Sequence, residues 1–396
     1  MNKLLLIPKR PYPPYEDGAT LIYYYMMKYF PKIHVIYLSG ENEQQNRLKE
    51  QTFKDYMYRH KVQYLKYTEP TKINKLSILN GYSYHMNSYF SKKNAYKIVE
   101  YIQENNIDII ICNYQMLRYA EFIKKATKCK IILHAIDAIS MAESRQISKS
   151  GVVTKIKKYV NSKLYYYIEK KYVKFDKIVV VSDVDAQYLC KTHNIPRSKI
   201  KVISNGVDTD YFCSVELKKS QKVNIGFSGI MNYYPNEQAV LYFLKNILPK
   251  LKDQKEKIKY WIIGKNPTTK IKQESIKFSE IVEITGFVND IRPYINTLDI
   301  FVSTLQSGGG IKNKILEAMA MGVPVIASSV SVEGINHEDT ILVYESDEEL
   351  ISYINKLIKD ENYRRHLSKK SRMIVEKKFS WKVQIKEYEN LLYKME

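Results

Sequence analysis

The sequence predicts a mixed α/β protein of two domains. Its 396 residues are too many for one typical core and suggest two domains of about 200 residues each. Short apolar runs rich in Ile and Val, such as IDIIIC at 107–112, alternate with longer segments of helical periodicity. This alternation is typical of parallel sheets whose strands are covered by helices on both faces.

The N-terminal half opens with an apolar run at 3–7 that predicts a buried strand. The segment PKRPYPPYEDGA follows as a rigid, proline-punctuated loop with Gly18 near its end. Residues 41–95 are rich in Asn, Gln, Lys and Tyr with weak periodicity, and we expect helices and loops there. The other strands predicted in this half are 34–38, 107–112, 130–134 and 175–182, and the helices are 20–30, 94–105 and one that begins near Asp183.

His134 lies at the carboxyl end of a predicted strand, the edge at which ligands of open α/β sheets collect. It is a candidate for contact with substrate, and a structural hydrogen-bonding role is the alternative. Asp137 could orient a substrate hydroxyl or cap the following helix. Asp183-Val184-Asp185 sits at a helix start, where N-capping explains it better than metal binding.

Lysines and tyrosines are interleaved at helical spacing in KIKKYVNSKLYYYIEKKYV, residues 155–173. Such a helix could lie on an anionic bilayer with its tyrosines at the level of the headgroups. An ordinary solvated helix whose apolar residues face the core is the alternative, and the pattern slightly favours it.

The charge of the chain is unevenly distributed. The formal net charge is +21, and residues 1–200 hold 34 Lys+Arg against 17 Asp+Glu, whereas residues 201–396 hold 29 against 25. A basic half suits an anionic membrane surface, a pyrophosphate-linked or polyanionic substrate, or nucleic acid. Compositional drift is a further explanation, because Lys, Asn, Ile and Tyr are all abundant. No groove-reading motif accompanies the charge, so we do not expect a nucleic-acid partner.

The four cysteines are scattered, without a Cys-x-x-Cys pair or neighbouring histidines at ligand spacing. Neither a disulfide framework nor a zinc site is expected, and a cytoplasmic location fits. The N-terminal apolar run ends at Pro8 and does not predict a signal peptide. No run approaches the ~20 apolar residues of a membrane span, so any membrane contact would be peripheral.

The C-terminal half begins after a turn signal at Asn205-Gly206. Residues 214–222 are polar and lysine-rich, as in a linker. The predicted strands of this half are 223–228, 259–264, 281–287, 299–303 and 323–327, and the helices are 237–251, 290–296, 314–321, 348–360, 361–377 and 381–395.

A glycine loop, Gly308-Gly309-Gly310, joins the strand at 299–303 to the helix at 314–321. Free N–H groups and the helix dipole make such a helix start an anion site, and Lys312 and Lys314 add positive charge. Glu317, one turn in, can accept two hydroxyl hydrogen bonds, which suits a ribose diol. The pattern indicates a nucleotide diphosphate site, and a loop that uses glycine only for tight packing is the alternative.

The segment GGGIKNKILEAMAMGVPVIAS resembles the donor site of retaining glycosyltransferases of family 4, which have the GT-B fold. Glu317 matches the second glutamate of the family's Glu-x7-Glu motif, and Gly309 stands where the first would be. The loop is similar to that of a branch with Gly-x-Lys-x-Lys, here Gly310-Ile311-Lys312-Asn313-Lys314.

The resemblance implies two Rossmann-like domains facing a deep cleft: an acceptor domain at 1–205, a nucleotide-sugar domain at 206–378, and a last helix at 379–396 that crosses back to the first. Many members bring an Arg or Lys to the diphosphate from the first loop of the second domain. Here none occurs between Gly226 and Lys245, so we hypothesise that Lys312 or Lys314 supplies that charge. The implied catalytic residues are His134, Asp137 and Lys312, and the implied donor-binding residues are Gly18, Ser228, Gly229, Phe287, Val288, Gly309, Gly310, Ile311, Lys312, Asn313, Lys314 and Glu317.

The resemblance further implies transfer of a sugar, most simply from a UDP-sugar, to a glycan or lipid-linked saccharide with retention of configuration. No residue stands out as a covalent nucleophile, so we expect a same-face displacement assisted by fixed positive charge, without a metal or cofactor. The basic N-terminal half fits a lipid-pyrophosphate acceptor at the inner membrane face, as in surface-polysaccharide assembly. A GT-B sugar-nucleotide epimerase and a non-catalytic polyanion-binding protein are the alternatives.

Overall fold

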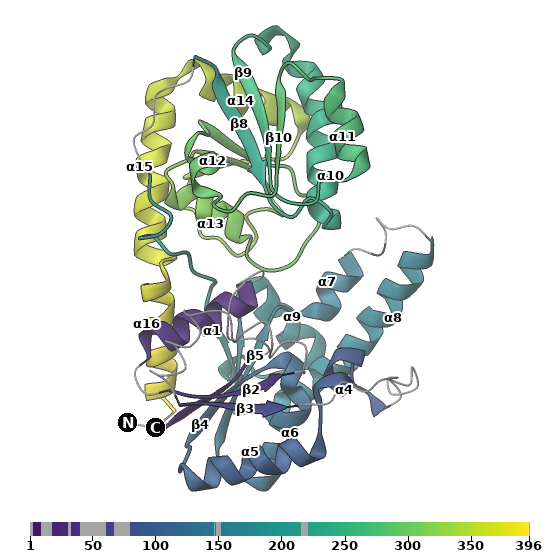
Figure 1. The fold of residues 1–396 in the computed structure, drawn as a ribbon, viewed down its shortest axis with the longest axis vertical. Coiled ribbons are helices and arrows are strands. Elements are labelled where there is room, and N and C mark those ends of the chain that lie inside the picture. Colours follow the sequence, from purple (N-terminus) through teal and green to yellow (C-terminus); the bar gives the residue numbers. More distant parts are fainter. Residues whose placement is uncertain are drawn as a thin grey trace. The chain divides into compact units, whose positions relative to one another are not determined.

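The computed structural model describes residues 3–8, 18–30, 33–39, 61–66, 80–145, 147, 152–214 and 221–395. The predicted loop at 9–17, much of the region 41–95 and part of the predicted linker lie outside these residues. The chain divides into two compact units (Figure 1). Unit 1 comprises Met1–Ser204 with Gln384–Glu396, and unit 2 comprises Asn205–Val383.

Unit 1 is built on a seven-stranded parallel sheet in the order β3-β2-β1-β4-β5-β6-β7. Its central strands are mostly apolar runs such as LLLI and IIICN, and every residue of these two strands is buried. Burial on both faces is what a parallel sheet between helices requires. The strands are β1 (Leu4–Ile7), β2 (His34–Ser39), β3 (Lys61–Lys66), β4 (Ile109–Asn113), β5 (Lys130–Ile136), β6 (Lys177–Val180) and β7 (Ile200–Val202).

The helices of unit 1 present apolar faces to this sheet. Ile98 and Ile102 of α5 and Ala120 and Ile123 of α6 join the same core cluster as Ile110 of β4. The helices are α1 (Gly18–Tyr29), α4 (Tyr84–Tyr89), α5 (Lys92–Glu104), α6 (Leu117–Ala126), α7 (Ile139–Arg145), α8 (Val152–Glu169) and α9 (Asp183–His193), with 3₁₀ turns at Tyr114–Met116, Lys170–Lys174 and Arg197–Lys199.

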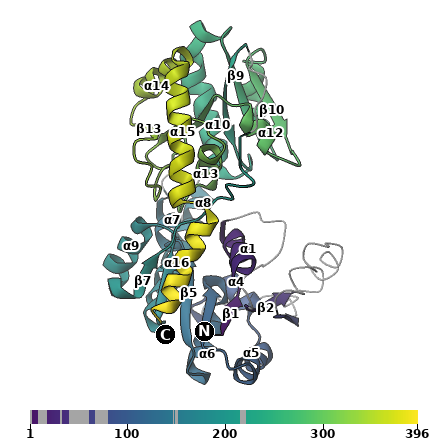
Figure 2. The ribbon, with the colours of Figure 1, turned by 90° about the vertical axis from the view of Figure 1, so that its left-hand side faces the viewer.

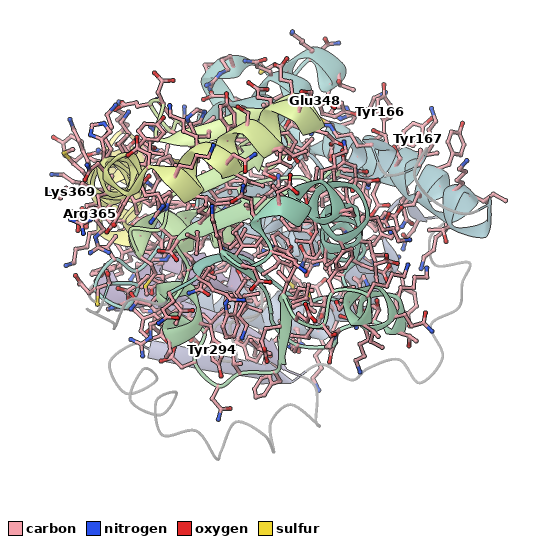
Figure 3. All side chains as sticks on the ribbon, turned by 90° about the horizontal axis from the view of Figure 1, so that it is seen from above. Tyr166, Tyr167, Tyr294, Glu348, Arg365 and Lys369 are labelled. Atoms are coloured by element: carbon pink, nitrogen blue, oxygen red, sulfur yellow. The ribbon has the colours of Figure 1, made fainter. Side chains whose placement is uncertain are left out.

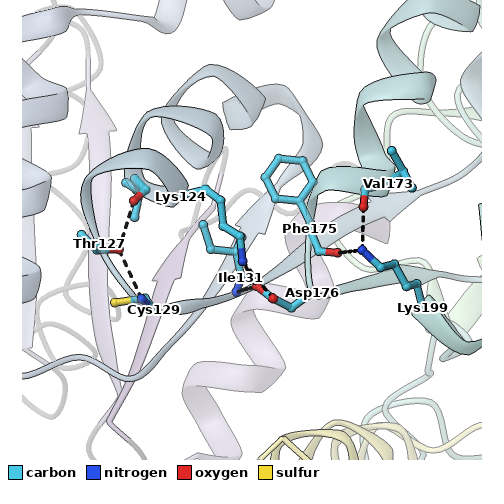
Figure 4. Close-up of polar contacts among 9 residues, drawn as sticks. Lys124, Thr127, Cys129, Ile131, Val173, Phe175, Asp176 and Lys199 are labelled. Atoms are coloured by element: carbon cyan, nitrogen blue, oxygen red, sulfur yellow. Dashed lines mark hydrogen bonds and ion pairs between the residues drawn. The ribbon is translucent and has the colours of Figure 1, made fainter.

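Asp176 fastens the amino ends of β5 and β6 (Figure 4). Its carboxylate accepts hydrogen bonds from the Ile131 backbone N–H at 2.8 Å and from Lys124 Nζ at 2.6 Å. Nearby, Lys199 Nζ donates to the carbonyl oxygens of Val173 and Phe175 at 2.6 and 3.0 Å. These bonds fix the start of the strand that carries His134.

Unit 2 contains a six-stranded parallel sheet in the order β10-β9-β8-β11-β12-β13. The strands are β8 (Val223–Ser228), β9 (Ile258–Ile263), β10 (Val282–Gly286), β11 (Ile300–Ser303), β12 (Val325–Ser328) and β13 (Ile341–Tyr344). The helices are α10 (Tyr234–Tyr242), continued by a π turn (Phe243–Ile247) and a 3₁₀ segment (Leu248–Gln254), then α11 (Thr269–Ile276), α12 (Arg292–Asn296), α13 (Asn313–Ala320), α14 (Asp347–Lys359) and α15 (Glu361–Lys378).

The last helix, α16 (Trp381–Tyr393), begins in unit 2 and belongs to unit 1 from Gln384 onward (Figure 2). At its start, the Val207 backbone N–H donates to the Phe379 carbonyl at 2.8 Å, and the Trp381 N–H donates to the Val207 carbonyl at 3.2 Å. Further along, Lys201 Nζ lies 2.6 Å from Glu387 Oε2. Within the described ranges, no helix is long and apolar enough to cross a membrane.

The α/β fold with two parallel sheets, predicted from the alternation of patterns, is confirmed. The prediction for 41–95 is wrong in one respect, because residues 61–66 form strand β3. Its sequence KVQYLK is too polar to be identified as a buried strand. Among the described strands β3 lies at the sheet edge and pairs only with β2, so its side chains need less burial. The sequence patterns also did not indicate β7, β13, α6 and α11.

Gly206 is required by the packing at the start of α16. A Cβ atom at this position would lie 2.6 Å from the Trp381 ring and 3.0 Å from the Trp381 Cα. We therefore expect Gly206→Ala to destabilise unit 2 by about 1–3 kcal/mol through overpacking. Both tryptophans of the chain, Trp261 and Trp381, lie in unit 2, so urea unfolding followed by tryptophan fluorescence measures the change. Ser279→Ala, at an exposed turn, is the control, and equal midpoints for the two variants would contradict this account.

Candidate functional site

The candidate site of unit 2 lies where the strand order of the sheet reverses. Strands β8 and β11 are neighbours, and β9 and β12 extend the sheet from them in opposite directions. Ligands of open α/β sheets bind outside the carboxyl ends of the strands at such a point. The loop after β8 contains Gly229, and the loop after β11 leads through Gly308–Gly310 into α13.

Lys314, in the first turn of α13, reaches the loop that follows β8. Its Nζ lies 2.6 Å from Asn236 Oδ1 and 4.3 Å from the centroid of the Phe227 ring. The amide oxygen and the ring face both favour a cation. Burial lowers the pKa of Lys314 to about 7, because it removes water from the ammonium, while the nearby Glu317 acts in the opposite direction.

Gly229 leaves the space that the Lys314 ammonium occupies. A Cβ atom on residue 229 would lie 2.7 Å from Lys314 Nζ and 2.7 Å from Asn236 Nδ2. Real Cβ atoms do not approach other heavy atoms this closely, so any other residue would displace one of the two side chains. Asn236 is itself held, because its Nδ2 donates to the Ile230 carbonyl at 3.0 Å.

Lys312 occupies the N-cap position of α13 and makes no side-chain cap. Its side chain is buried, and its Nζ donates to the Gly310 carbonyl at 2.6 Å. A helix start without a side-chain cap keeps backbone N–H groups for another acceptor. Two lysines and the positive end of the helix dipole therefore converge on this loop.

Glu317 follows Lys314 by three residues on the same helix. Burial raises the pKa of the Glu317 carboxyl to about 7, while the nearby Lys314 ammonium acts in the opposite direction. A half-buried carboxylate and a half-buried ammonium each become easier to charge when the other is charged. Together Gly229, Asn236, Lys312, Lys314 and Glu317 form what we call the Lys314 site.

A serine network joins the two strand ends beside this site. Ser303 Oγ and Ser331 Oγ are 2.8 Å apart, and Ser328 Oγ donates to the Leu305 carbonyl at 2.6 Å. Ser303 and Ser331 are fully buried. These bonds hold the beginning of the glycine loop against β12.

The other predicted donor-binding residues of unit 2 fall along the same carboxyl edge of the sheet. Ser228 ends β8 and is buried, and Asn313 Oδ1 accepts a hydrogen bond from Asn205 Nδ2 at 3.1 Å. Phe287 is 72% exposed directly after β10. Of the predicted residues, Gly309, Gly310 and the buried Ile311 lie in the glycine loop itself. Val288 directly follows Phe287 in the loop after β10.

His134, in unit 1, is completely buried between two tyrosines. Its Nδ1 lies 3.2 Å from the Tyr23 hydroxyl, and its Nε2 lies 3.1 Å from the Tyr388 hydroxyl. Burial lowers the pKa of the imidazole to about 3, so the ring is neutral at physiological pH. Both ring nitrogens are engaged, and a catalytic role for His134 remains a prediction.

The chain turns sharply between His134 and Asp137. Ile136 has a φ of +70°, which is rare for a β-branched residue, and the pairing of β5 with β6 shifts register there. Asp137 is half-buried directly after this turn. The N–H of the next residue, Ala138, is bound by Asp185 Oδ1 at 2.8 Å.

Asp185 thus links the start of α7 to α9, and the N-cap of α9 is Ser182. Gly18 is the first residue of α1, and the loop before it lies outside the described residues. Among the side chains that the structure describes, no group of three or more His, Cys, Asp or Glu is placed to hold a metal ion.

Comparisons with protein families cover both units. The family described as Glycosyltransferase Family 4 matches residues 60–211, and the family described as Glycosyl transferases group 1 matches residues 222–360. The chain is a glycosyltransferase of the family 4 type. Two uncharacterized glycosyltransferases of Methanocaldococcus jannaschii, MJ1069 and MJ1607, are 23% and 26% identical to it. The alignments span 63% and 52% of this chain and 67% and 56% of those relatives.

Solved structures similar to this glycosyltransferase have the GT-B fold. A glycosyltransferase from Rickettsia africae is 19% identical, with a TM-score of 0.68 over 98% of this chain and 97% of its own. Anabaena HepE in complex with UDP is 16% identical, with a TM-score of 0.70 over 99% of this chain and 100% of its own. At these identities the likeness concerns the fold.

One residue of the glycosyltransferase's Lys314 site was not indicated by any sequence pattern. Asn236 lies in the first turn of α10, directly after Pro235, where nothing marks it as a binding residue, and its partner Lys314 is 78 residues away. The contact places the Lys314 ammonium beside the segment 229–236, which has no Arg or Lys of its own. That this lysine supplies the charge for a diphosphate stays a prediction. Lys312 Nζ instead donates to the Gly310 carbonyl within the glycine loop.

The buried neutral His134 predicts a loss of stability in acid. The unfolded chain binds a proton at this imidazole below about pH 6.5, and the folded chain does so only near pH 3. The free energy of unfolding therefore falls as the pH decreases from 6.5 toward 3, by up to about 1.4 kcal/mol per pH unit from this group. His134→Gln should show a shallower decrease in urea unfolding across this window. The exposed His366 provides the control variant His366→Gln, and identical slopes for all three proteins would refute the assignment.

Proposed function

We propose that the chain is a retaining hexosyltransferase that moves a sugar from a UDP-sugar to a glycan or lipid-linked saccharide. Residues 206–378 would form the donor-binding domain, residues 1–205 the acceptor domain, and residues 379–396 the helix that packs back on it. The observation that carries the proposal is the position of Lys314 Nζ, which lies against Asn236 and beside Gly229 in the exit loop of β8.

The Lys314 site supplies what a diphosphate needs. The Lys314 ammonium would bind the phosphate oxygens, and the N–H groups at the start of α13 and beside Gly229 would donate further hydrogen bonds. A bound diphosphate would also stabilise the charged form of Lys314, whose pKa burial holds near 7. Lys312 would add positive charge from the same loop.

The nucleoside would extend from the diphosphate along the edge of the sheet. Glu317 would accept hydrogen bonds from the two ribose hydroxyls. The exposed Phe287 ring and the backbone of Val288 would meet the base, because an exposed aromatic ring suits stacking. Uracil is favoured by the similar structures of Anabaena HepE, which contain UDP or UDP-glucose.

Catalysis would depend on stabilising the departing diphosphate. The bond between the anomeric carbon and the β-phosphate oxygen breaks, and the acceptor hydroxyl bonds to the same face of that carbon. The hydroxyl proton passes to the leaving phosphate oxygen. Lys314, Lys312 and the dipole of α13 are fixed in place before the charge develops, which is the electrostatic arrangement that lowers such a barrier. His134 and Asp137 would assist from the acceptor domain, where the strained turn at Ile136 positions Asp137.

The acceptor would be lipid-linked. The excess of basic residues in the N-terminal half matches a pyrophosphate-linked acceptor presented at an anionic membrane surface, as in the assembly of surface polysaccharides.

Thermal shift with UDP, GDP, ADP and CMP in the presence of EDTA tests the donor site. At a hundred times its dissociation constant a ligand stabilises the folded state by about 2.7 kcal/mol. We expect UDP to stabilise the wild type and to have little effect on Glu317→Ala. Glu280→Ala removes an exposed carboxylate of the same unit and should respond as the wild type does. No response to any nucleotide would overturn the proposal, and a response only without EDTA would overturn its metal independence.

Affinity for UDP should decrease above pH 7. Burial places the pKa of Lys314 near 7, and a diphosphate binds the ammonium rather than the neutral amine. The dissociation constant should therefore increase with pH above 7, by up to tenfold per pH unit until the bound form also loses its proton. Calorimetry between pH 7 and 9 measures this. Lys314→Met should bind more weakly and lack the pH dependence, whereas Lys272→Met on α11 should retain it. A pH-independent wild type would show that Lys314 does not bind the diphosphate.

A further inference from the structure

Helix α8 carries a cluster of apolar side chains that the rest of unit 1 leaves exposed. Ile156, Tyr159, Val160 and Tyr167 are 62%, 55%, 53% and 60% exposed. Their spacing of three, four and seven residues places them on one face of the helix. Each other α-helix in the described parts of the chain has at most one large apolar residue so exposed.

Lysines accompany this face. Lys163 lies within it, with its Nζ 5.6 Å from the centre of the Tyr159 ring, and Lys155 and Lys157 flank it in the first turns. Just past the end of the helix, Lys170 Nζ lies 4.7 Å from the Tyr166 ring. We call Ile156, Tyr159, Val160, Lys163 and Tyr167 the α8 stripe. Figure 3 shows the Tyr167 side chain projecting outward from the helix.

The opposite side of α8 is firmly attached to unit 1. Ser162 Oγ donates to the Ser140 carbonyl at 3.0 Å, and Lys158 Nζ lies 3.3 Å from Glu143 on α7. Glu169, the one acidic residue of α8, is fully buried and lies 3.0 Å from His193 Nε2. The exposed face of α8 therefore carries no negative charge of its own, and its orientation is fixed by the buried side.

We propose that the α8 stripe docks unit 1 on an anionic lipid bilayer. Tyrosine rings suit the headgroup region, aliphatic side chains can enter the acyl boundary, and lysines bind anionic headgroups. A second copy of this face would bring the same lysines together and be repelled. A soluble polyanion would leave Ile156 and Val160 without an apolar environment. The inference rests on the proposed lipid-linked acceptor for its purpose, but vesicle binding is measured without any donor or acceptor.

Co-sedimentation with vesicles tests the docking on the full chain. We expect binding to vesicles of phosphatidylcholine with about 30% phosphatidylglycerol. Binding to vesicles of phosphatidylcholine alone should be weaker by about tenfold or more. Neutralising one lysine should weaken vesicle binding about fivefold. Because Lys155→Glu/Lys163→Glu reverses two charges, its affinity for the vesicles should decrease by more than this factor for each lysine. The variant Ile156→Ser/Tyr159→Ser should weaken binding even at low salt, because it removes the apolar part.

A matched variant on α11 controls for general charge and apolarity. Lys272 and Ile276 are exposed on that helix of unit 2, Ile276 by 72%, so Lys272→Glu/Ile276→Ser should bind vesicles as the wild type does. Thermal unfolding confirms that each variant is folded, and UDP binding by the α8 variants tests the donor site separately. Absent vesicle binding, equal binding to neutral vesicles, or an unchanged affinity in both α8 variants would overturn the docking. A dimer in light scattering that the Ile156→Ser/Tyr159→Ser variant abolishes would instead assign the stripe to a second copy.

Discussion

The Lys314 ammonium is the charge around which the candidate site of unit 2 is organised. It lies against the Asn236 amide and the Phe227 ring, in space that exists because residue 229 is glycine. Burying an ammonium is unfavourable unless opposite charge or polar partners surround it. Asn236 and Glu317 meet part of that need, and an anionic ligand would meet the rest. In the proposed function, a diphosphate is that ligand.

The topology of the sheet makes this contact possible. Lys314 follows β11 and Asn236 follows β8, and these strands are neighbours only because the strand order reverses between them. The serine network then fixes where the glycine loop leaves β11. The family 4-type loop lacks the first glutamate of the common motif, since Gly309 stands there, and two lysines are concentrated at the helix start instead.

His134 of unit 1 is uncharged, in contrast to the Lys314 ammonium of unit 2. His134 is neutral and held by Tyr23 and Tyr388, which come from α1 and α16. The final helix therefore contributes directly to the core around β5. The first partly accessible polar side chain after this strand is Asp137, which is half-buried and follows the strained turn at Ile136. The α8 stripe is a separate feature, in the connection between β5 and β6, and consists of exposed side chains.

The sequence by itself determined the α/β class, most strands and helices, and the position of the glycine loop between β11 and α13, because buried strands and amphipathic helices impose local periodicity and glycine and proline mark the turns. It did not determine strand β3, whose edge position tolerates polar residues, or the neutral state of His134, whose partners are 111 and 254 residues away. The contact between Lys314 and Asn236 also came only from the tertiary structure. The strand order brings the start of α13 next to α10, and Lys314, in the first turn of α13, reaches Asn236, whereas Lys312, at the N-cap, donates to Gly310.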